Sequence, residues 1–132
     1  MHPGITPDLL DWYINRGTKG VILEGTGLGH VPTFPKSEKM SWIPSIQRAT
    51  DEGTFIGLTR QCLNGSVHPY VYRALRTGLQ AGVTYLHDML PETAFVKLGW
   101  ALGNFPETAS EVMQDNIAGE FSRLNKYKEY RI

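Results

Sequence analysis

Residues 20–31, with the sequence Gly-Val-Ile-Leu-Glu-Gly-Thr-Gly-Leu-Gly-His-Val, constrain the fold of this chain more than any other stretch. The apolar run at its start predicts a buried strand over 20–24, and three glycines at alternate positions predict a loop directly behind it. Loops at the carboxyl ends of parallel strands are where open α/β sheets bind ligands. The loop therefore predicts a binding site whose polar side chains are Thr26 and His30, and a plain tight turn is the alternative.

Two nucleotide-binding patterns do not fit this loop. A dinucleotide fingerprint, Gly-x-Gly-x-x-Gly, needs a glycine where this chain has His30. A phosphate-binding loop needs Gly-Lys followed by Ser or Thr, and no such triplet follows the glycines. The sequence therefore disfavours a nucleotide-binding loop, and it indicates no cofactor.

Composition narrows the class of protein further. The chain has 132 residues, 41% of them hydrophobic and 20% charged, as in an ordinary globular domain. Thirteen basic and thirteen acidic residues cancel, which argues against a nucleic-acid surface over the whole domain. A single cysteine and four scattered histidines lack the spacing of metal ligands. No signal peptide or apolar stretch long enough to span a bilayer is evident, so the cytoplasm is the expected location.

Helical and strand patterns alternate along the chain. The predicted elements, in order, are a helix opened by Thr6-Pro7-Asp8 and closed by Gly17, strand 20–24, a loop over 25–38, helix 41–52, strand 54–59, helix 70–81, helix 88–103 entered through Pro91, and helix 106–121. This order predicts an α/β fold of flavodoxin or Rossmann-like type, with three layers (αβα) around a small parallel sheet. Two strands are too few for five helices, so we expect an upstream first strand to be missing. The basic residues over 123–131 are expected to form a solvated C-terminus.

Four stretches in this order carry a resemblance to a known family. They read Glu24-Gly-Thr-Gly-Leu-Gly-His-Val-Pro32, Thr59-Arg-Gln-Cys-Leu-Asn-Gly-Ser-Val67, Asp88-Met-Leu-Pro-Glu-Thr-Ala94 followed by Lys97 and Leu98, and Asn116-x-Ala-Gly-Glu120. Together they resemble the C-terminal domain of the bacterial-type L-asparaginase family. Within that family, the first and third stretches are most similar to the branch formed by the glutaminase subunit (the D subunit) of archaeal glutamyl-tRNA(Gln) amidotransferases.

The resemblance implies a function for a longer protein. Family members have two α/β domains, and the N-terminal domain carries a threonine nucleophile in a Thr-Gly-Gly-Thr loop. In the glutaminase subunit this site releases ammonia from glutamine, and the partner E subunit of the amidotransferase uses the ammonia to amidate glutamate attached to tRNA. This chain contains no Thr-Gly-Gly-Thr, so residues 1–132 are expected to form only the C-terminal domain, without catalytic residues and inactive in isolation.

The resemblance also implies roles for individual residues. In the family this domain forms a homodimer interface and completes the neighbouring subunit's active site, where His30 matches a residue that reaches toward the substrate. Thr26, Gly27, Gly29 and Tyr72 are expected to contribute to the same substrate-binding region. The alternatives are a loop histidine held by main-chain hydrogen bonds and a tyrosine packed in the core.

The loop after strand 54–59 holds a second candidate site. In cytoplasmic asparaginases the corresponding loop borders an effector site, and the guanidinium of Arg60 is suited to a carboxylate. Cys62 would be reactive beside a positive charge, although a buried, inert cysteine is the more common case. Elsewhere, Glu92 is explained by the helix dipole, Lys97 is expected to be a solvated or interface charge, and Trp12, Trp42 and Trp100 are expected in the core or an interface.

Two functions of different classes follow from the sequence. The first is the glutaminase subunit of a tRNA-dependent amidotransferase, with a cytoplasmic L-asparaginase as its enzymatic alternative, so that glutamine or asparagine is the substrate. The second is a non-catalytic module that binds an amino acid. The expected partners of the first are a second copy of the chain, the amidotransferase E subunit and, through the complex, tRNA.

Overall fold

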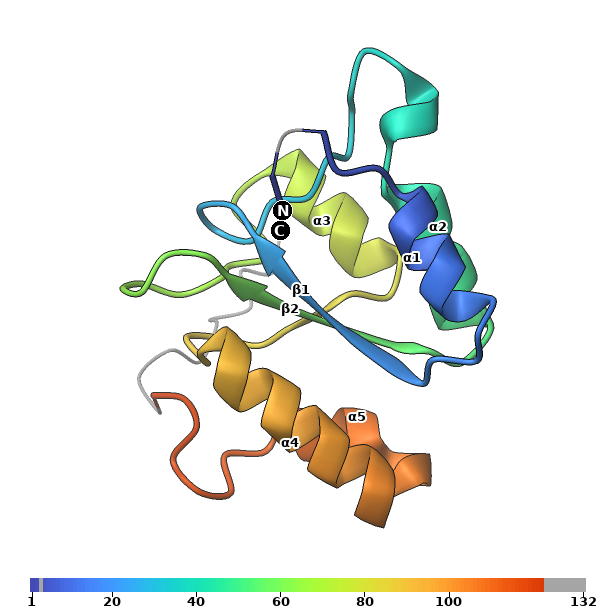
Figure 1. Cartoon of the computed structure of the whole chain (residues 1–132). Helices are drawn as coiled ribbons and strands as arrows, with labels where there is room; N and C mark the ends of the chain where they lie inside the picture. The colour runs from blue at the N-terminus through green and yellow to red at the C-terminus, as the bar shows by residue number, and fades with distance from the viewer. Residues whose placement is uncertain (3, 123–132) are drawn as a thin grey trace.

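The computed structural model describes residues 1–2 and 4–122, and the basic residues over 123–131 lie outside this part of the chain. Its core is a parallel sheet with the order β1-β2-β3, formed by β1 (Gly20–Gly25), β2 (Phe55–Arg60) and β3 (Thr84–Tyr85). Strands β1 and β2 pair in register from Gly20 opposite Phe55 to Gly25 opposite Arg60. The carboxyl ends of β1 and β2 therefore meet at one edge of the sheet (Figure 1).

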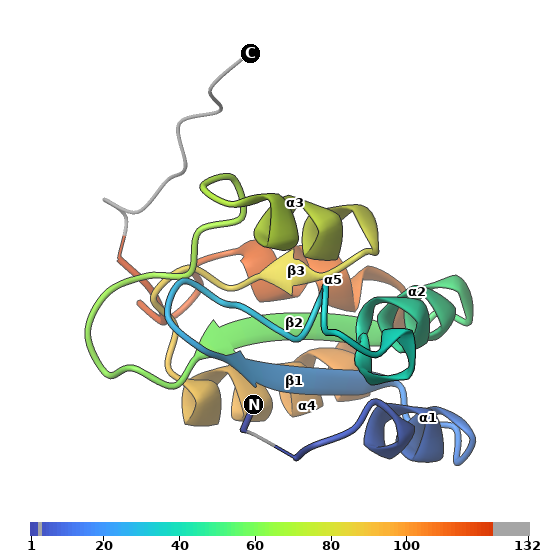
Figure 2. The ribbon, with the colours of Figure 1, turned by 90° about the horizontal axis from the view of Figure 1, so that it is seen from above.

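Helices cover both faces of this sheet. On one face lie α1 (Asp8–Ile14), α2 (Ile43–Asp51) and α3 (Arg73–Gln80), and on the other lie α4 (Pro91–Asn104) and α5 (Ala109–Gln114) (Figures 1 and 2). Two short 3₁₀ helices, η1 (Glu38–Met40) and η2 (Pro106–Thr108), complete the described part of the chain. This arrangement confirms the predicted three-layer α/β architecture.

The alternation of side chains along the strands explains why both faces are covered. Leu23 and Leu58 point into an apolar cluster beneath α1, α2 and α3, whereas Ile22 and Phe55 pack against a second cluster beneath α4 and α5. Successive residues of a strand point to opposite faces, so strands with apolar residues at successive positions must be buried on both sides there. Trp42 is almost fully buried in the first cluster, which confirms its expected place in the core.

Two element predictions were wrong. Strand β3 was not predicted, because two residues give no periodic signal. The last helix, expected over 106–121, begins as a 3₁₀ turn and ends at Gln114, because Asp115 adopts an extended backbone (φ −83°, ψ 136°). Ile117, which falls inside the expected helix, is 56% exposed in the loop that follows α5.

The first helix begins later than its sequence signals suggest. The hydroxyl of Thr6 donates a hydrogen bond to the Asp8 carboxylate (3.3 Å), and no side chain caps the amino end of α1. Gly17 has a positive φ of 77°, as expected of a residue that ends a helix. Trp12 is half-exposed on the outer side of α1, and so is Trp100 on α4.

Candidate functional site

The glycine-rich loop after β1 closes on itself as a tight turn. The N–H of Thr26 donates to the carbonyl of His30 (3.0 Å), and the N–H of His30 donates to the carbonyl of Thr26 (2.8 Å). The N–H of Gly29 also donates to the carbonyl of Thr26 (3.0 Å). The backbone N–H groups of Gly29 and His30 are therefore used within the turn, whereas Thr26 is exposed and Leu28 packs against the core.

Glycine is required for steric reasons at two positions, Gly25 at the end of β1 and Gly29 in the turn. Gly29 has a φ of 103°, and a Cβ built on it would lie 2.5 Å from Cδ2 of Leu58. A Cβ on Gly25 would lie 2.7 Å from the carbonyl carbon of Gly29. Both distances are too short for a side chain, so the turn can lie this close to β2 only with glycine at these positions.

The turn brings His30 beside Tyr72. Their ring centroids are 5.4 Å apart with the planes tilted by 43°, and Tyr72, just before α3, is 54% exposed. Core packing of Tyr72 was therefore the wrong alternative. Thr26 and Gly27 are exposed on the same turn, and His30 is half-buried. The four residues form a small polar surface that can donate and accept hydrogen bonds.

Strand β2 ends in a buried arginine. Arg60 is 5% exposed, and its Nη2 donates to the carbonyl of Leu63 (3.0 Å). Among the described residues, its Nε and Nη1 atoms have no hydrogen-bond partner. Cys62, two residues further on, is exposed, so the more common buried state was the wrong expectation for this thiol.

A carboxylate after β3 is influenced by this arginine. Partial burial raises the pKa of the Asp88 carboxyl, but hydrogen bonds from Ser122 and the positive charge of Arg60 outweigh it and lower the pKa below its ordinary value. One of these bonds runs from the N–H of Ser122 to Oδ1 of Asp88 (2.8 Å). The electrostatic field at the carboxyl ends of β2 and β3 therefore favours an ionised Asp88.

A buried ion pair holds the segment after α5 against α4. Nζ of Lys97 lies 2.9 Å from Oε1 of Glu120, and the two side chains are only 5% and 10% exposed. Lys97 also donates to the carbonyl of Asp115, and Oε2 of Glu120 accepts from the N–H of Ala118 (2.8 Å). A solvated or interface role for Lys97 was therefore a wrong expectation.

Sequence reasoning missed Asp88 and Glu120 as interacting groups. Their partners are 34 and 23 residues away in the chain, so no local spacing reveals them. Over residues 1–2 and 4–122, no cluster of three or more His, Cys, Asp or Glu side chains is arranged to hold a metal ion. In the same part of the chain, no helix combines the length and the apolar character needed to cross a membrane.

The fold and the loop motifs together define a class of domain. A three-layer α/β domain that carries Glu-Gly-Thr-Gly-Leu-Gly-His at the end of its first strand fits the expected C-terminal domain of an amidohydrolase. The family model described as "Glutaminase/Asparaginase C-terminal domain" matches residues 1–114. This chain belongs to that family.

Individual relatives indicate which branch of the family this chain resembles. The D subunit of glutamyl-tRNA(Gln) amidotransferase from Methanothermobacter thermautotrophicus is 45% identical over 132 residues, which cover 98% of this chain and 29% of that protein. The same subunit from Pyrococcus furiosus is 44% identical over 134 residues, covering 100% of this chain and 29% of that protein. The predicted resemblance to the amidotransferase subunit is thus confirmed, and this chain spans less than a third of the length of these relatives.

Solved structures agree on the fold. The thermostable L-asparaginase from Thermococcus kodakarensis matches with a TM-score of 0.79 and 33% identity, over 92% of this chain and 36% of that one. L-asparaginase I from Vibrio cholerae matches with a TM-score of 0.78 and 27% identity, over the same shares of the two chains.

Proposed function

We propose that this chain acts as the C-terminal domain of the glutaminase subunit of a tRNA-dependent amidotransferase. The parent subunit hydrolyses the side-chain amide of glutamine to glutamate and ammonia, and the ammonia converts Glu-tRNA(Gln) to Gln-tRNA(Gln). The observation that carries this proposal is the 45% identity to an amidotransferase D subunit across 98% of the chain. The threonine nucleophile belongs to an N-terminal domain of the same longer polypeptide, so residues 1–132 alone are inactive.

The domain's own role is to dimerise and to complete the active site of a neighbouring subunit. In this proposal His30, Tyr72 and Thr26 face the α-amino end of the substrate, and Gly27 and Gly29 shape the turn that presents them. The exposure of Thr26 and Tyr72 and the partial exposure of His30 beside Tyr72 support this role, because an imidazole, a phenol and a hydroxyl can all bind a zwitterionic amino acid by hydrogen bonds.

The loop over Arg60 and Cys62 is a candidate effector site. Two guanidinium nitrogens of Arg60 have no partner among the described residues, and a buried cation with unused donors suits the carboxylate of an amino acid. Cys62 is exposed, two residues after Arg60. Arg60 is thus proposed as the carboxylate contact and Cys62 as a bordering residue.

The partners follow from the same proposal. Two copies associate through an asparaginase-type interface, the amidotransferase E subunit receives the ammonia, and tRNA is contacted through the complex. The net charge of zero agrees with an indirect contact to tRNA, because a domain that grips phosphates needs an excess of basic side chains. The proposed location is the cytoplasm.

A domain exchange tests the proposal. The matching C-terminal region of the Methanothermobacter thermautotrophicus relative is replaced by residues 1–132, and ammonia release is measured with glutamine and with asparagine. The proposal predicts that glutamine is the better substrate of the chimera and that the isolated chain releases no ammonia. A folded chimera without amidohydrolase activity would contradict it and would favour a non-catalytic amino-acid-binding module.

One observation favours a second candidate. The solved structure that matches at 33% identity is an L-asparaginase, so the parent is alternatively a cytoplasmic L-asparaginase. Both candidates use the same amide hydrolysis and differ in the length of the substrate side chain. A chimera that prefers asparagine over glutamine would select this alternative.

A further inference from the structure

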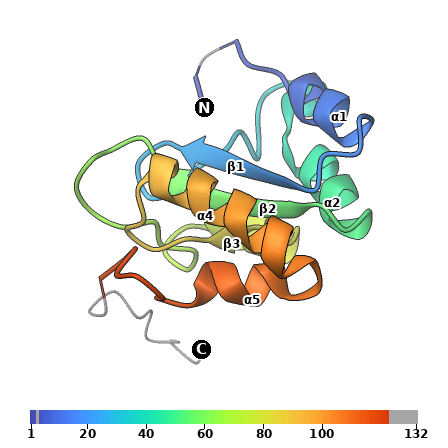
Figure 3. The same ribbon diagram turned by 60° about the horizontal axis from the view of Figure 1, so that its bottom comes forward.

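The neutral total charge of this chain hides an uneven distribution of charged residues. Residues 88–122, which include α4 and α5, contain six acidic residues and a single basic residue, Lys97. Residues 25–37 and 53–87 contain no acidic residue but four basic ones. The four are Lys36, Arg60, Arg73 and Arg76. Because α4 and α5 lie together on one face of the sheet (Figure 3) and α3 lies on the other, the surroundings of α3 are the part of the domain that attracts anions.

Two loops that are distant in the chain meet beside α3. The N–H of His68 donates to the carbonyl of Leu28 (3.0 Å), which joins the loop before α3 to the turn after β1. Further along the same two segments, the guanidinium carbon of Arg73 lies 4.9 Å from the centroid of the Phe34 ring. The segments over 28–34 and 68–73 therefore form one continuous surface.

This surface carries cations and aromatic rings side by side. We call it the α3 surface and define it by Phe34, Lys36, Tyr70, Arg73 and Arg76. Phe34 and Tyr70 are 60% and 36% exposed, and the three basic side chains are exposed as well. Nη1 of Arg76 donates to the carbonyl of Tyr70 (2.8 Å), which holds this guanidinium at the loop that carries the tyrosine.

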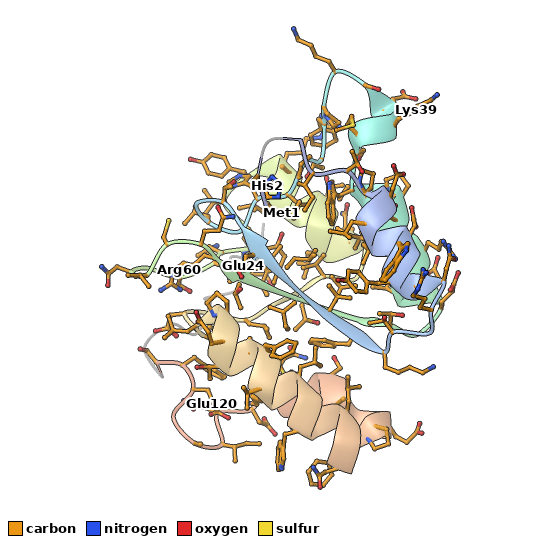
Figure 4. The ribbon with its side chains drawn as sticks, viewed as in Figure 1. Met1, His2, Glu24, Lys39, Arg60 and Glu120 are labelled. Atoms are coloured by element: carbon orange, nitrogen blue, oxygen red, sulfur yellow. The ribbon has the colours of Figure 1, made fainter. Side chains whose placement is uncertain are left out.

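The positive charge of the α3 surface is not cancelled locally. The ion pairs formed among residues 1–2 and 4–122 join Arg48 and Lys97 to acidic partners and involve none of the three cations of the α3 surface. Glu38, the acidic residue that follows this part of the chain, is succeeded by Lys39 on η1 (Figure 4), so η1 adds no net charge. Three exposed cations are thus left to bind an external anion.

This combination fits single-stranded nucleic acid. Guanidinium and ammonium groups attract the phosphates of its backbone, and exposed aromatic rings stack on its unpaired bases. The planar guanidinium of Arg73, which lies over the ring of Phe34, belongs to the same stacking surface. An acidic protein segment fits less well, because it would satisfy the cations but would leave the exposed rings of Phe34 and Tyr70 without a stacking partner.

We propose that the α3 surface binds a short stretch of single-stranded nucleic acid, with Lys36, Arg73 and Arg76 at phosphates and with Phe34 and Tyr70 stacked on bases. This goes beyond the proposed function, in which tRNA is contacted through the complex, and it does not depend on that function. The acidic residues of α4 and α5 do not prevent binding. They lie on the opposite face of the sheet, and physiological salt screens exposed charges over about 8 Å.

Fluorescence anisotropy of a labelled RNA tests this proposal. The probe is a twelve-nucleotide RNA of mixed sequence without self-complementarity, titrated with the chain at neutral pH between about 50 and 200 mM KCl. Three neutralised phosphates predict that the logarithm of the binding constant falls with the logarithm of the salt concentration with a slope of about −2. Residues 123–132 are the same in every variant, so their basic side chains contribute equally throughout.

Two kinds of variant separate the charges from the rings. Arg73→Gln/Arg76→Gln is expected to weaken binding at least about tenfold at the lowest salt and to reduce the slope to about −0.7. Lys36→Gln/Arg73→Gln, which keeps the bond from Arg76 to Tyr70, is expected to act in the same way and serves if the first variant does not fold. Phe34→Leu is expected to weaken binding at least about fivefold with the slope unchanged.

The matched controls change the same residue types elsewhere. Arg16→Gln removes an arginine that also lies over an aromatic ring, 3.5 Å from the centroid of Trp12, but beside a helix with two acidic residues in its first turn. Phe105→Leu removes a ring that is 44% exposed at the end of α4. Both controls are expected to bind the RNA as the parent chain does.

The results that would overturn the proposal are distinct. Folded variants of the α3 surface that bind the RNA as tightly as the two controls would overturn it. Equally tight binding of a twelve-residue polyglutamate peptide would overturn it in favour of an acidic protein partner. None of these measurements uses ammonia release, so a failed domain exchange and a failure to bind RNA are separate results.

Discussion

The buried pair of Lys97 and Glu120 gives the sharpest energetic prediction. Each side chain is at least nine-tenths covered, and the pair joins the loop after α5 to α4. Removing one member leaves the other charge buried without compensation, which costs about 3–5 kcal/mol. We expect Lys97→Met to lower the free energy of unfolding by about 3 kcal/mol or more, and Glu120→Gln by somewhat less, because the glutamine amide oxygen keeps an acceptor for Lys97 and for the N–H of Ala118.

Two further variants make this prediction refutable. The double variant Lys97→Met/Glu120→Leu removes both charges and is expected within about 1 kcal/mol of the parent chain. The control Glu52→Gln breaks an exposed pair with Arg48 (2.8 Å) and is expected to cost at most about 0.5 kcal/mol. The assay is urea unfolding at neutral pH. Single changes at Lys97 or Glu120 that cost no more than the control would refute the reasoning.

The pH dependence of the same pair follows from its chemistry. Burial raises the pKa of the Glu120 carboxyl, but the hydrogen bond and charge of Lys97 outweigh it and lower the pKa below the ordinary value of 4.5. A carboxyl with a lowered pKa stabilises the fold above its unfolded-state pKa, and this stabilisation is lost as the pH falls. The stability difference between the parent chain and Glu120→Gln is therefore expected to be constant above about pH 5 and to shrink below pH 4.5.

Two further predictions concern single positions. Gly29→Ala is expected to destabilise the fold by at least about 2 kcal/mol in urea unfolding, because the φ of Gly29 is positive and the new Cβ would meet Leu58. Gly103→Ala, where an added Cβ meets no neighbouring atom of α4's surroundings, is expected to stabilise the fold by about 0.5–1 kcal/mol. Equal effects of the two substitutions would contradict the packing argument. Cys62 is exposed, so one thiol per chain is expected to react with Ellman's reagent without denaturant, and a reaction that appears only on unfolding would contradict its position.

The sequence predicted the parts of the fold that have a local cause. The apolar residues in the first part of β1 and of β2 predict these strands because buried strands need successive apolar residues, and α2 between them follows from its periodicity and the glycine at 53. The end of α5 at Gln114 was missed because the periodic pattern continues to Ile117, although the chain turns away at Asp115. Tertiary contacts decided that boundary.

In the candidate site, too, the sequence predicted positions that have a local cause and missed contacts between distant residues. The position of His30 in a turn at the sheet edge follows from the glycines around it, but its contact with Tyr72 joins residues 42 positions apart and has no local signal. The burial of Arg60 and Lys97 was equally hidden, because sequence patterns treat arginine and lysine as surface residues. Long-range partners of charged groups become visible only in three dimensions.

We propose that the turn at His30 contributes to an amidohydrolase active site, and kcat/KM for glutamine in the chimeric subunit tests this role most directly. His30→Ala is compared with Lys39→Ala, an exposed change on η1 away from the turn (Figure 4). We predict that His30→Ala lowers kcat/KM at least about tenfold, the effect of about 1.4 kcal/mol of lost transition-state binding, while Lys39→Ala leaves it unchanged. Equal kcat/KM values for both variants in folded chimeras would contradict the claim.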